Sequence, residues 1–299
     1  MEKKIIIQES CPRDGWQNHT HFIPTETKIK YITEMLASGA KKLEVTSFVN
    51  SKIMPQMADA AEVFAAIKPI AKKMHCKLSA LALNQKGAER ALEAGADILG
   101  FALSASEEHN LRNSHRPLQE SMDNFKKLAA QNSQAEIVLC IACFFGSPFG
   151  DIITKERMQW LLEEAQSVGV YKFGLADTAG ICNPQKMRQK LRFLKSIIPI
   201  ENISIHLHDT YGMGLANAFV AIEEGFTQFD SSLAGMGGCP FAPGAKGNIA
   251  TEDLVHLCEQ LGYATDYDLA KLVANSETMC REIGAANNSS VTKALACHK

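Results

Sequence analysis

The chain has 299 residues, of which 46% are hydrophobic and 21% are charged, and its formal net charge is -2. This composition is that of a globular protein, and the length suits one large α/β barrel or two average domains. A near-neutral chain without a basic cluster does not attract polyanions, so we expect no nucleic-acid partner. The longest apolar run, residues 137–145, is far shorter than the roughly 20 residues of a membrane helix, so we expect no membrane partner.

The two chain ends and the cysteines bear on location and redox chemistry. Neither end carries a recognisable targeting or anchoring signal, which predicts a cytoplasmic protein. The nine cysteines are scattered rather than spaced as a disulfide framework, so we expect most of them to be small buried residues. Cys140 and Cys143 form a CxxC pair, but they fall in an apolar run typical of a strand, where residues three apart face opposite sides. This disfavours a shared redox or metal role.

A sequence pattern recurs along the chain: a helical segment ends at a glycine, and an apolar strand follows within a few residues. The glycines of its four clear occurrences are at positions 39, 95, 169 and 225. A glycine that ends a helix before a short loop is the joint that βα units reuse. With the gaps filled, the sequence predicts eight strands, at residues 5–10, 42–48, 77–83, 97–103, 136–144, 171–177, 203–209 and 228–234.

Amphipathic stretches with apolar residues at helical spacing lie between the predicted strands. The clearest are residues 26–38, 119–131, 155–167 and 184–197. Eight strands that alternate with helices in about 250 residues predict a TIM (β/α)8 barrel, with a doubly wound open sheet as the alternative. Because no flexible linker divides the chain, we predict a single catalytic TIM-barrel domain over residues 1–299. The barrel would span about 3–250, and additional C-terminal helices about 251–299.

In such a barrel the chemistry lies at the carboxyl ends of the strands, and polar residues gather at these positions. They come from the ends of the first, second, sixth and seventh strands and from the glycine-rich loop after the eighth. The candidate site residues are Arg13, Asp14, Gln17, Glu44, Asp177, His206, His208, Cys239 and Asn248.

His206 and His208 give the sharpest local signal. Residues two apart on a strand share a face, so both imidazoles can reach one point, as in a two-histidine metal site. The alternative is two barrel-interior histidines that are hydrogen-bonded to neighbours. A carboxylate at Asp14 and an amide oxygen at Asn248 favour the metal site. Two nitrogens with two oxygens suit a divalent cation such as Mg²⁺ or Mn²⁺.

Arg13 and Cys239 each have a structural and a functional interpretation. Arg13 beside Asp14 could form only a surface ion pair. A carboxylate at Glu44 inside the barrel would need a partner, however, and Arg13 on the adjacent strand end would supply a bidentate one. Cys239 is either a small loop residue or a proton donor or acceptor, because its glycine-rich loop permits movement and close approach to a ligand.

These residues resemble those of the 3-hydroxy-3-methylglutaryl-CoA lyase family, within a wider group of metal-dependent lyase and synthase TIM barrels. The resemblance covers essentially the whole chain. Its most specific stretch, DSSLAGMGGCPFAPGAKGNIATEDLV from Asp230, contains the loop that separates these lyases from the related synthases. The other matching stretches are PRDGWQN from Pro12, LEVTSFVNSKIMPQMAD from Leu43, SASE from Ser104, LADTAG from Leu175 and HLHDTYGMGLAN from His206.

The resemblance implies metal-dependent retro-Claisen cleavage of 3-hydroxy-3-methylglutaryl-CoA to acetyl-CoA and acetoacetate. The implied ligands of the divalent cation (Mg²⁺ or Mn²⁺) are Asp14, His206, His208 and Asn248. His206 would remove the hydroxyl proton, Arg13 would stabilise the enolate, and Cys239 would protonate it. Asp177 and Glu44 would support the site, and Gln17 would contact the substrate.

The resemblance also implies an acyl-CoA as the small-molecule partner, a homodimer, and a place in leucine degradation and ketone-body formation. Cys297 resembles a family cysteine that can form a regulatory disulfide between subunits, although a terminal thiol can equally be idle. Such a disulfide stays one of two interpretations of this residue.

Several residues depart from the expected family pattern without touching the metal set. They are Trp16, His19, Ser147, Gly174, Lys246 and residues 107–117. Because these positions could reshape the acyl pocket, an alternative is the same mechanism on a longer 3-hydroxyglutaryl-CoA or on citramalyl-CoA. A condensing synthase of the isopropylmalate type is less favoured, because the chain has the lyase loop and lacks the regulatory region that such synthases often carry. A non-catalytic metal- or CoA-binding barrel is the remaining alternative.

Overall fold

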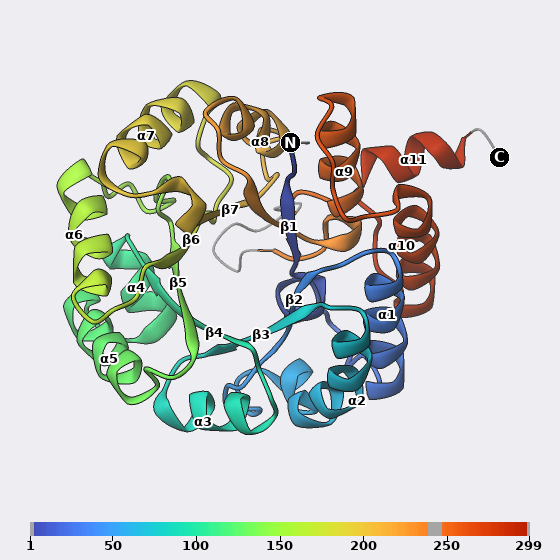
Figure 1. Ribbon diagram of the computed structural model, residues 1–299, viewed down its shortest axis with the longest axis horizontal. Helices are drawn as coiled ribbons and strands as arrows, with labels where there is room; N and C mark the ends of the chain where they lie inside the picture. Colours follow the sequence, from blue (N-terminus) through green and yellow to red (C-terminus); the bar gives the residue numbers. More distant parts are fainter. Residues whose placement is uncertain (1–2, 239–246, 298–299) are drawn as a thin grey trace.

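The computed structural model describes residues 3–238 and 247–297 of the chain. Eight parallel strands close into a barrel in chain order, so the predicted TIM barrel is confirmed and the open-sheet alternative is wrong (Figure 1). The strands are β1 (Ile6–Glu9), β2 (Lys42–Ser47), β3 (Lys77–Ala82), β4 (Ile98–Ser104), β5 (Glu136–Ala142), β6 (Lys172–Asp177), β7 (Ile203–Leu207) and β8 (Gln228–Ser231).

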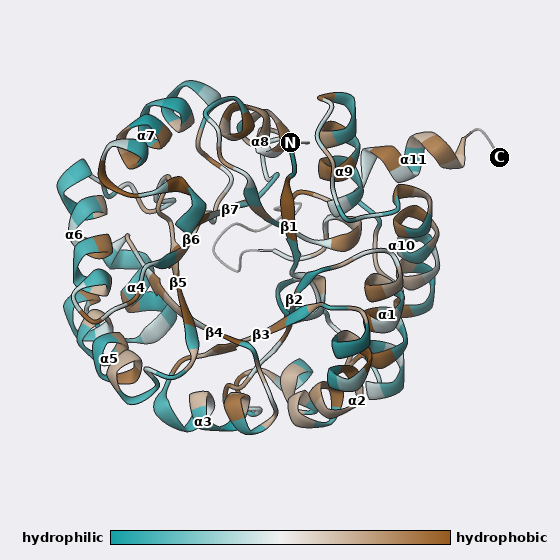
Figure 2. Ribbon diagram, viewed as in Figure 1, coloured by the Kyte–Doolittle hydropathy of each residue, from teal (hydrophilic) through white to brown (hydrophobic). Residues whose placement is uncertain are grey.

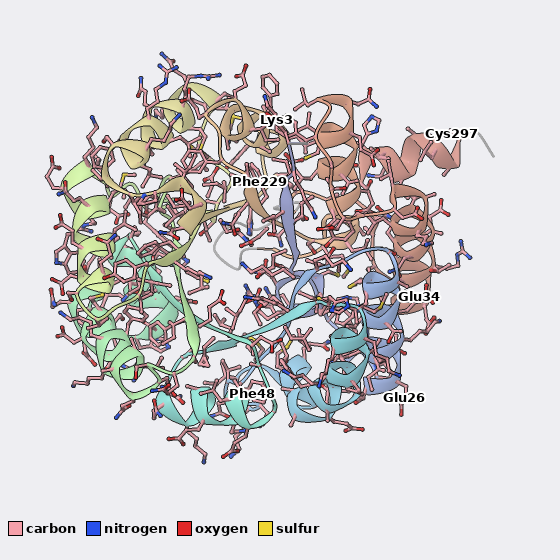
Figure 3. The ribbon with its side chains drawn as sticks, in the orientation of Figure 1. Lys3, Glu26, Glu34, Phe48, Phe229 and Cys297 are labelled. Atoms are coloured by element: carbon pink, nitrogen blue, oxygen red, sulfur yellow. The ribbon has the colours of Figure 1, made fainter. Side chains whose placement is uncertain are left out.

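Helices surround the barrel and extend it on one side. They are α1 (Thr25–Ala37), α2 (Ala60–Lys73), α3 (Gln85–Glu93), α4 (Glu107–Ser114), α5 (Leu118–Gln131), α6 (Lys155–Gln166), α7 (Pro184–Ile197), α8 (Gly214–Glu223), α9 (Thr251–Gln260), α10 (Leu269–Ile283) and α11 (Ser290–Ala296). The additional C-terminal helices begin where the sequence predicts. α10 packs against both α1 and α9, and α11 projects outward with Cys297 at its exposed end (Figures 1 and 3). No helix in the described part of the chain is long and apolar enough to cross a membrane.

The four predicted glycine joints adopt the left-handed backbone conformation that ends a helix. Their φ angles are 114° at Gly39, 93° at Gly95, 81° at Gly169 and 94° at Gly225. At Gly39 the space is also restricted, because an added Cβ would lie 2.0 Å from the Asp266 carbonyl oxygen. A side chain at this joint would therefore meet both backbone strain and a backbone clash.

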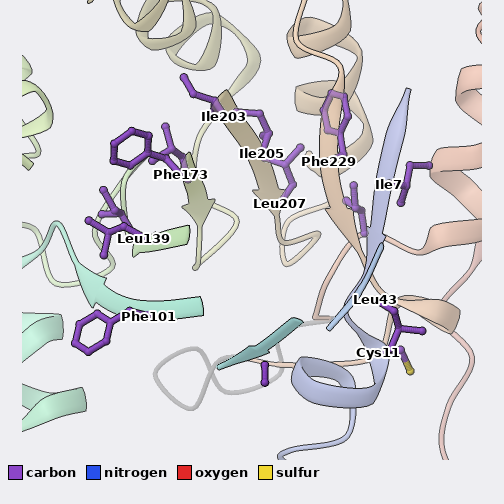
Figure 4. Packing of buried hydrophobic residues seen from close by; sticks show 14 of the residues in the cluster. Ile7, Cys11, Leu43, Phe101, Leu139, Phe173, Ile203, Ile205, Leu207 and Phe229 are labelled. Atoms are coloured by element: carbon purple, nitrogen blue, oxygen red, sulfur yellow. The ribbon is translucent and has the colours of Figure 1, made fainter. Parts of the chain in front are cut away.

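The apolar core lies mainly between the barrel wall and the helices. Phe101, Leu139 and Phe173 project from neighbouring strands into this layer (Figure 4), and the ring of Phe101 lies 5.3 Å from that of Phe125 on α5. When coloured by hydropathy, the strands carry brown stretches and the outer helix faces are largely teal (Figure 2). The barrel interior is left to smaller and more polar side chains, including Cys140 opposite Gly174.

The predicted strands extend beyond the observed ones at several carboxyl ends. β1 ends at Glu9 and leads into a π-helical turn, η1 (Cys11–Gly15), and β8 is followed by a 3-10 turn, η4 (Leu233–Gly235). β5 ends at Ala142, so Cys143 lies outside the strand, with a φ of 54°, and the predicted placement of both CxxC cysteines within one strand is wrong. The observed strands end earlier than predicted because the polar rim is built from turns, and the apolar pattern of the sequence does not predict where these turns begin.

Candidate active site

The turn η1 directly follows β1 and carries Arg13 and Asp14. Nη1 of Arg13 lies 2.7 Å from Oδ1 of Asp14, and Nη2 lies 2.8 Å from Oε2 of Glu44 on β2. The predicted pairing of Arg13 with the buried Glu44 is confirmed, and the turn also brings Asp14 to the same guanidinium, which thus joins two carboxylates. Burial alone would lower the pKa of Arg13, but the two carboxylates outweigh it and raise the pKa above its usual value. The side chain is therefore a permanent cation that is rigidly held.

Asp14, His206 and His208 converge on one point. Ligand atoms from these three side chains all lie within 4.8 Å of one another. Nε2 of His206 is 3.2 Å from Nε2 of His208 and 3.9 Å from Oδ2 of Asp14. His206 lies on β7, whereas His208 lies just beyond its end and forms a bridge with Asn248. The sequence thus predicted the convergence correctly, although it placed both histidines within the strand.

Asn248 completes this group with an amide oxygen. Its Nδ2 donates to Oδ2 of Asp14 at 2.6 Å and to the carbonyl oxygen of Met236 at 3.0 Å. Its Oδ1 is buried and has no hydrogen-bond partner among the described residues. An unpaired amide oxygen next to a carboxylate and two imidazole nitrogens fits a divalent cation, whose binding would satisfy it. The residues present therefore suit a divalent metal of the kind that the sequence predicts.

The electrostatics of this group favour metal-binding protonation states at Asp14 and His208, whereas Asp230 and Asp14 outweigh the effect of burial and raise the pKa of His206. Burial would raise the pKa of Asp14, but Arg13, His206, His208 and Asn248 together lower it to about 2. Burial and the neighbouring His206 lower the pKa of His208 to about 4. At neutral pH Asp14 is therefore an anion and His208 is neutral, as ligation requires.

Asp230 on β8 is a site residue to which the sequence reasoning assigned no role. Its Oδ2 lies 3.4 Å from Nδ1 of His206, and Ser204 donates a hydrogen bond of 2.7 Å to its Oδ1. His206 and Asp230 are paired in the register of β7 and β8. A carboxylate behind a ligating histidine fixes its tautomer and ring orientation. The signal for Asp230 lies in this pairing between strands, which local sequence patterns do not reveal.

The remaining predicted residues have different surroundings. Gln17 lies in the site, where its Nε2 donates to Oδ1 of Asp14 at 3.2 Å. Asp177 instead accepts hydrogen bonds from the backbone N–H groups of Ile181 (3.2 Å) and Cys182 (3.0 Å), so its visible contacts hold the loop after β6. Burial raises the pKa of Asp177 to about 6. Cys239 lies outside the described residues, as does Lys246.

Comparison with known proteins assigns a family to this arrangement. The model of the HMGL-like family matches residues 4–279. The chain belongs to this family. The HMGL-like assignment agrees with the resemblance in the sequence, and the matched residues include Asp14, His206 and His208.

Individual relatives match over nearly the whole length of this chain. The chain is 37% identical, over 99% of its length and 98% of the relative's, to "3-hydroxy-3-isohexenylglutaryl-CoA/hydroxy-methylglutaryl-CoA lyase" of Pseudomonas aeruginosa. It is 35% identical to the cytoplasmic 3-hydroxy-3-methylglutaryl-CoA lyase of Mus musculus, over 97% of this chain and 84% of the relative. A solved HMG-CoA lyase from Acinetobacter baumannii, in complex with coenzyme A and 3-methylmalate, matches with a TM-score of 0.92 and 37% identity. That alignment covers 97% of this chain and 95% of the solved one.

Proposed function

We propose that this protein is a metal-dependent carbon-carbon lyase that cleaves 3-hydroxy-3-methylglutaryl-CoA to acetyl-CoA and acetoacetate. The observation that carries the proposal is the convergence of Asp14, His206 and His208 next to the fixed cation of Arg13. Relatives at 35–37% identity carry names of this activity. The supporting logic is chemical: the reaction needs an oxygen-binding Lewis acid and a positive charge where the enolate forms.

The proposed ligands are Asp14, His206, His208 and Asn248. A bound divalent cation, Mg²⁺ or Mn²⁺, would polarise the hydroxyl and carboxylate oxygens of the substrate. The hydroxyl proton then leaves, the bond between the alpha and beta carbons breaks, and its electron pair passes to the thioester as an enolate. Arg13 stabilises that enolate, because its guanidinium is held in place by Glu44 and cannot turn away.

Two proton transfers complete the proposed reaction. His206 is the proposed base, and only its Nε2 faces the ligand cluster, since Nδ1 faces Asp230. Metal ligation and proton transfer thus compete for the lone pair on Nε2. The two roles of His206 can be distinguished by comparing the Mn²⁺ affinity of the His206→Gln variant with its turnover. Cys239 is proposed to return a proton to the enolate carbon. Gln17 is proposed to contact the substrate, and Asp177 to order the loop after β6.

A second candidate is the same cleavage with a larger substituent on the hydroxyl-bearing carbon. Gly174 and Cys140 are neighbours in the register of β6 and β5, and a Cβ added at Gly174 would lie 3.4 Å from Sγ of Cys140, an ordinary van der Waals contact. Glycine therefore leaves a space there that a side chain could fill. The Pseudomonas relative is named for an isohexenyl as well as a methyl substrate.

A panel of hydroxyacyl-CoA thioesters, assayed with Mg²⁺, with Mn²⁺ and with EDTA, tests these proposals. Acetoacetate release from the methyl substrate that EDTA abolishes is the expected result, and full activity in EDTA would refute the metal-dependent mechanism. Gly174→Ser should lower kcat/KM for the longer substrates and leave the methyl substrate unaffected. An unchanged ratio would remove the second candidate.

The broader predictions belong to the same proposal. We propose that residues 1–299 act as a single catalytic domain, because one cluster of buried apolar side chains extends from Ile5 in the barrel to Cys280 in α10. The acyl-CoA partner, the homodimer, the cytoplasmic location and the place in leucine degradation or ketone-body formation stay predictions.

A further inference from the structure

A buried carboxylate outside the ligand set links the segments that surround it. Glu9, the last residue of β1, is 0% exposed and accepts three hydrogen bonds. Its Oε1 accepts from the backbone N–H groups of Cys11 and Leu233, both at 2.9 Å. Its Oε2 accepts from Oγ1 of Thr251 at 2.8 Å. The three donors belong to the first residues of η1, η4 and α9.

These three segments carry or flank the oxygen ligands of the proposed metal site. η1 contains Asp14, and α9 begins three residues after Asn248. η4 leads directly to Met236, whose carbonyl oxygen accepts the hydrogen bond from the Asn248 amide at 3.0 Å. A displacement of any of these segments would therefore change the 2.6 Å contact between Asn248 and Asp14.

The surroundings of Glu9 are unusual for a carboxylate that is needed only for packing. No basic side chain in the described part of the chain forms an ion pair with it, and burial raises its pKa to about 7. An unpaired carboxyl group costs free energy in the interior, which only its hydrogen bonds offset. Its burial is thus costly in free energy, and its three donors all lie in segments that carry or flank the oxygen ligands.

We propose that Glu9 is a positioning residue that sets the geometry of the oxygen ligands Asp14 and Asn248 by tying η1, η4 and α9 together. This inference rests on the metal site of the proposed function. His206 depends on it less, because β7 and Asp230 place this histidine.

Direct binding of Mn²⁺ to the full-length, metal-free protein, measured by the paramagnetic resonance of free Mn²⁺, tests this role. Glu9→Ala removes the acceptor of all three donors and should raise the Kd for Mn²⁺ by about 10–100-fold, the range found when groups behind metal ligands are removed. Glu9→Gln should largely rescue binding, to within about threefold, since its oxygen can keep both N–H donors and its amide can donate to the hydroxyl of Thr251.

Asp253 provides a matched control. It is also buried, and its carboxylate accepts hydrogen bonds from Ser289, Ser290 and Val291 at the start of α11, away from the ligands. Asp253→Ala should lower the melting temperature as Glu9→Ala does but leave the Kd for Mn²⁺ unchanged. Equal Kd values for the two variants and the wild type would overturn the positioning role.

Two further outcomes are also decisive. If Glu9→Ala does not fold, Thr251→Val removes a single donor and should raise the Kd by a smaller but measurable factor; an unchanged Kd in that variant would overturn the proposal. If the wild-type protein itself binds no Mn²⁺, the proposed metal function and the role of Glu9 both fail. Wild-type binding together with unaltered Glu9 variants refutes only the positioning role.

Discussion

The nitrogen half and the oxygen half of the proposed metal site are built in different ways. His206 lies on β7 and His208 just beyond its end, where the two-residue repeat of extended backbone points them the same way. Asp14 comes from the turn η1 and Asn248 from the segment before α9, 234 residues away in the chain, and buried polar contacts hold them. The difference shows that the nitrogen half follows from one strand and its immediate continuation, whereas the oxygen half needs the closed barrel and its tethered segments.

The largest effect is expected at Arg13, which lies in the turn η1 together with Asp14 of the oxygen half. Arg13→Met should lower kcat by about 10²–10³-fold, because it removes the fixed cation from the developing enolate. It should also destabilise the fold by about 3–5 kcal/mol, since Glu44 would stay buried without its ion partner. Steady-state kinetics and denaturant unfolding measure the two effects. A variant with wild-type turnover would show that Arg13 serves only the structure.

The next largest effect is expected at Asp230, which contacts His206 in the nitrogen half of the site. Asp230→Asn should weaken Mn²⁺ binding by about 10–100-fold, because His206 loses the carboxylate that fixes its tautomer. Titration of the metal-free protein by calorimetry measures this. If binding is unaffected, the strand alone orients His206, and the contrast between the two halves becomes sharper.

A pH-dependent effect on folding stability is expected at Glu252, which lies beside the oxygen half of the site. Glu252 is buried and accepts hydrogen bonds from the Ala234 N–H, and burial raises its pKa from 4.5 to about 7. Between these values the folded protein holds a proton that the unfolded chain has released, so this group lowers stability as the pH rises from about 4.5 to about 7. Unfolding free energies of Glu252→Gln should show less of this decline than those of the wild type. Parallel pH profiles would contradict the expectation.

The smallest effect is expected at Ser204, which donates one hydrogen bond to Asp230. Ser204→Ala should cost about 1 kcal/mol of stability, and it should weaken Mn²⁺ binding less than Asp230→Asn does. Both variants should be titrated under the same conditions. A Ser204 effect larger than that of Asp230 would reverse the order assumed for this half of the site.

The main features that depend on local sequence were predicted correctly, whereas several contacts between distant segments were not. Gly39 and its equivalents were predictable because a left-handed helix end is a local property of the chain. The convergence of the two histidines was predictable for the same reason, even though His208 lies past the end of β7. The division of the Arg13 guanidinium between two carboxylates was not predictable, because the π-helical turn that presents Asp14 has no sequence signal of its own.

The sequence alone determined the barrel, its joints, its additional helices and the residues that gather on its rim. These features depend on backbone conformation and apolar periodicity within a few residues of each position. The tertiary structure decided the contact between Asp14 and Asn248, the carboxylate behind His206 and the three segments joined at Glu9. Barrel closure brings β8 beside β1, so residues more than 200 positions apart become neighbours. The pairing of β7 with β8 places Asp230 behind His206.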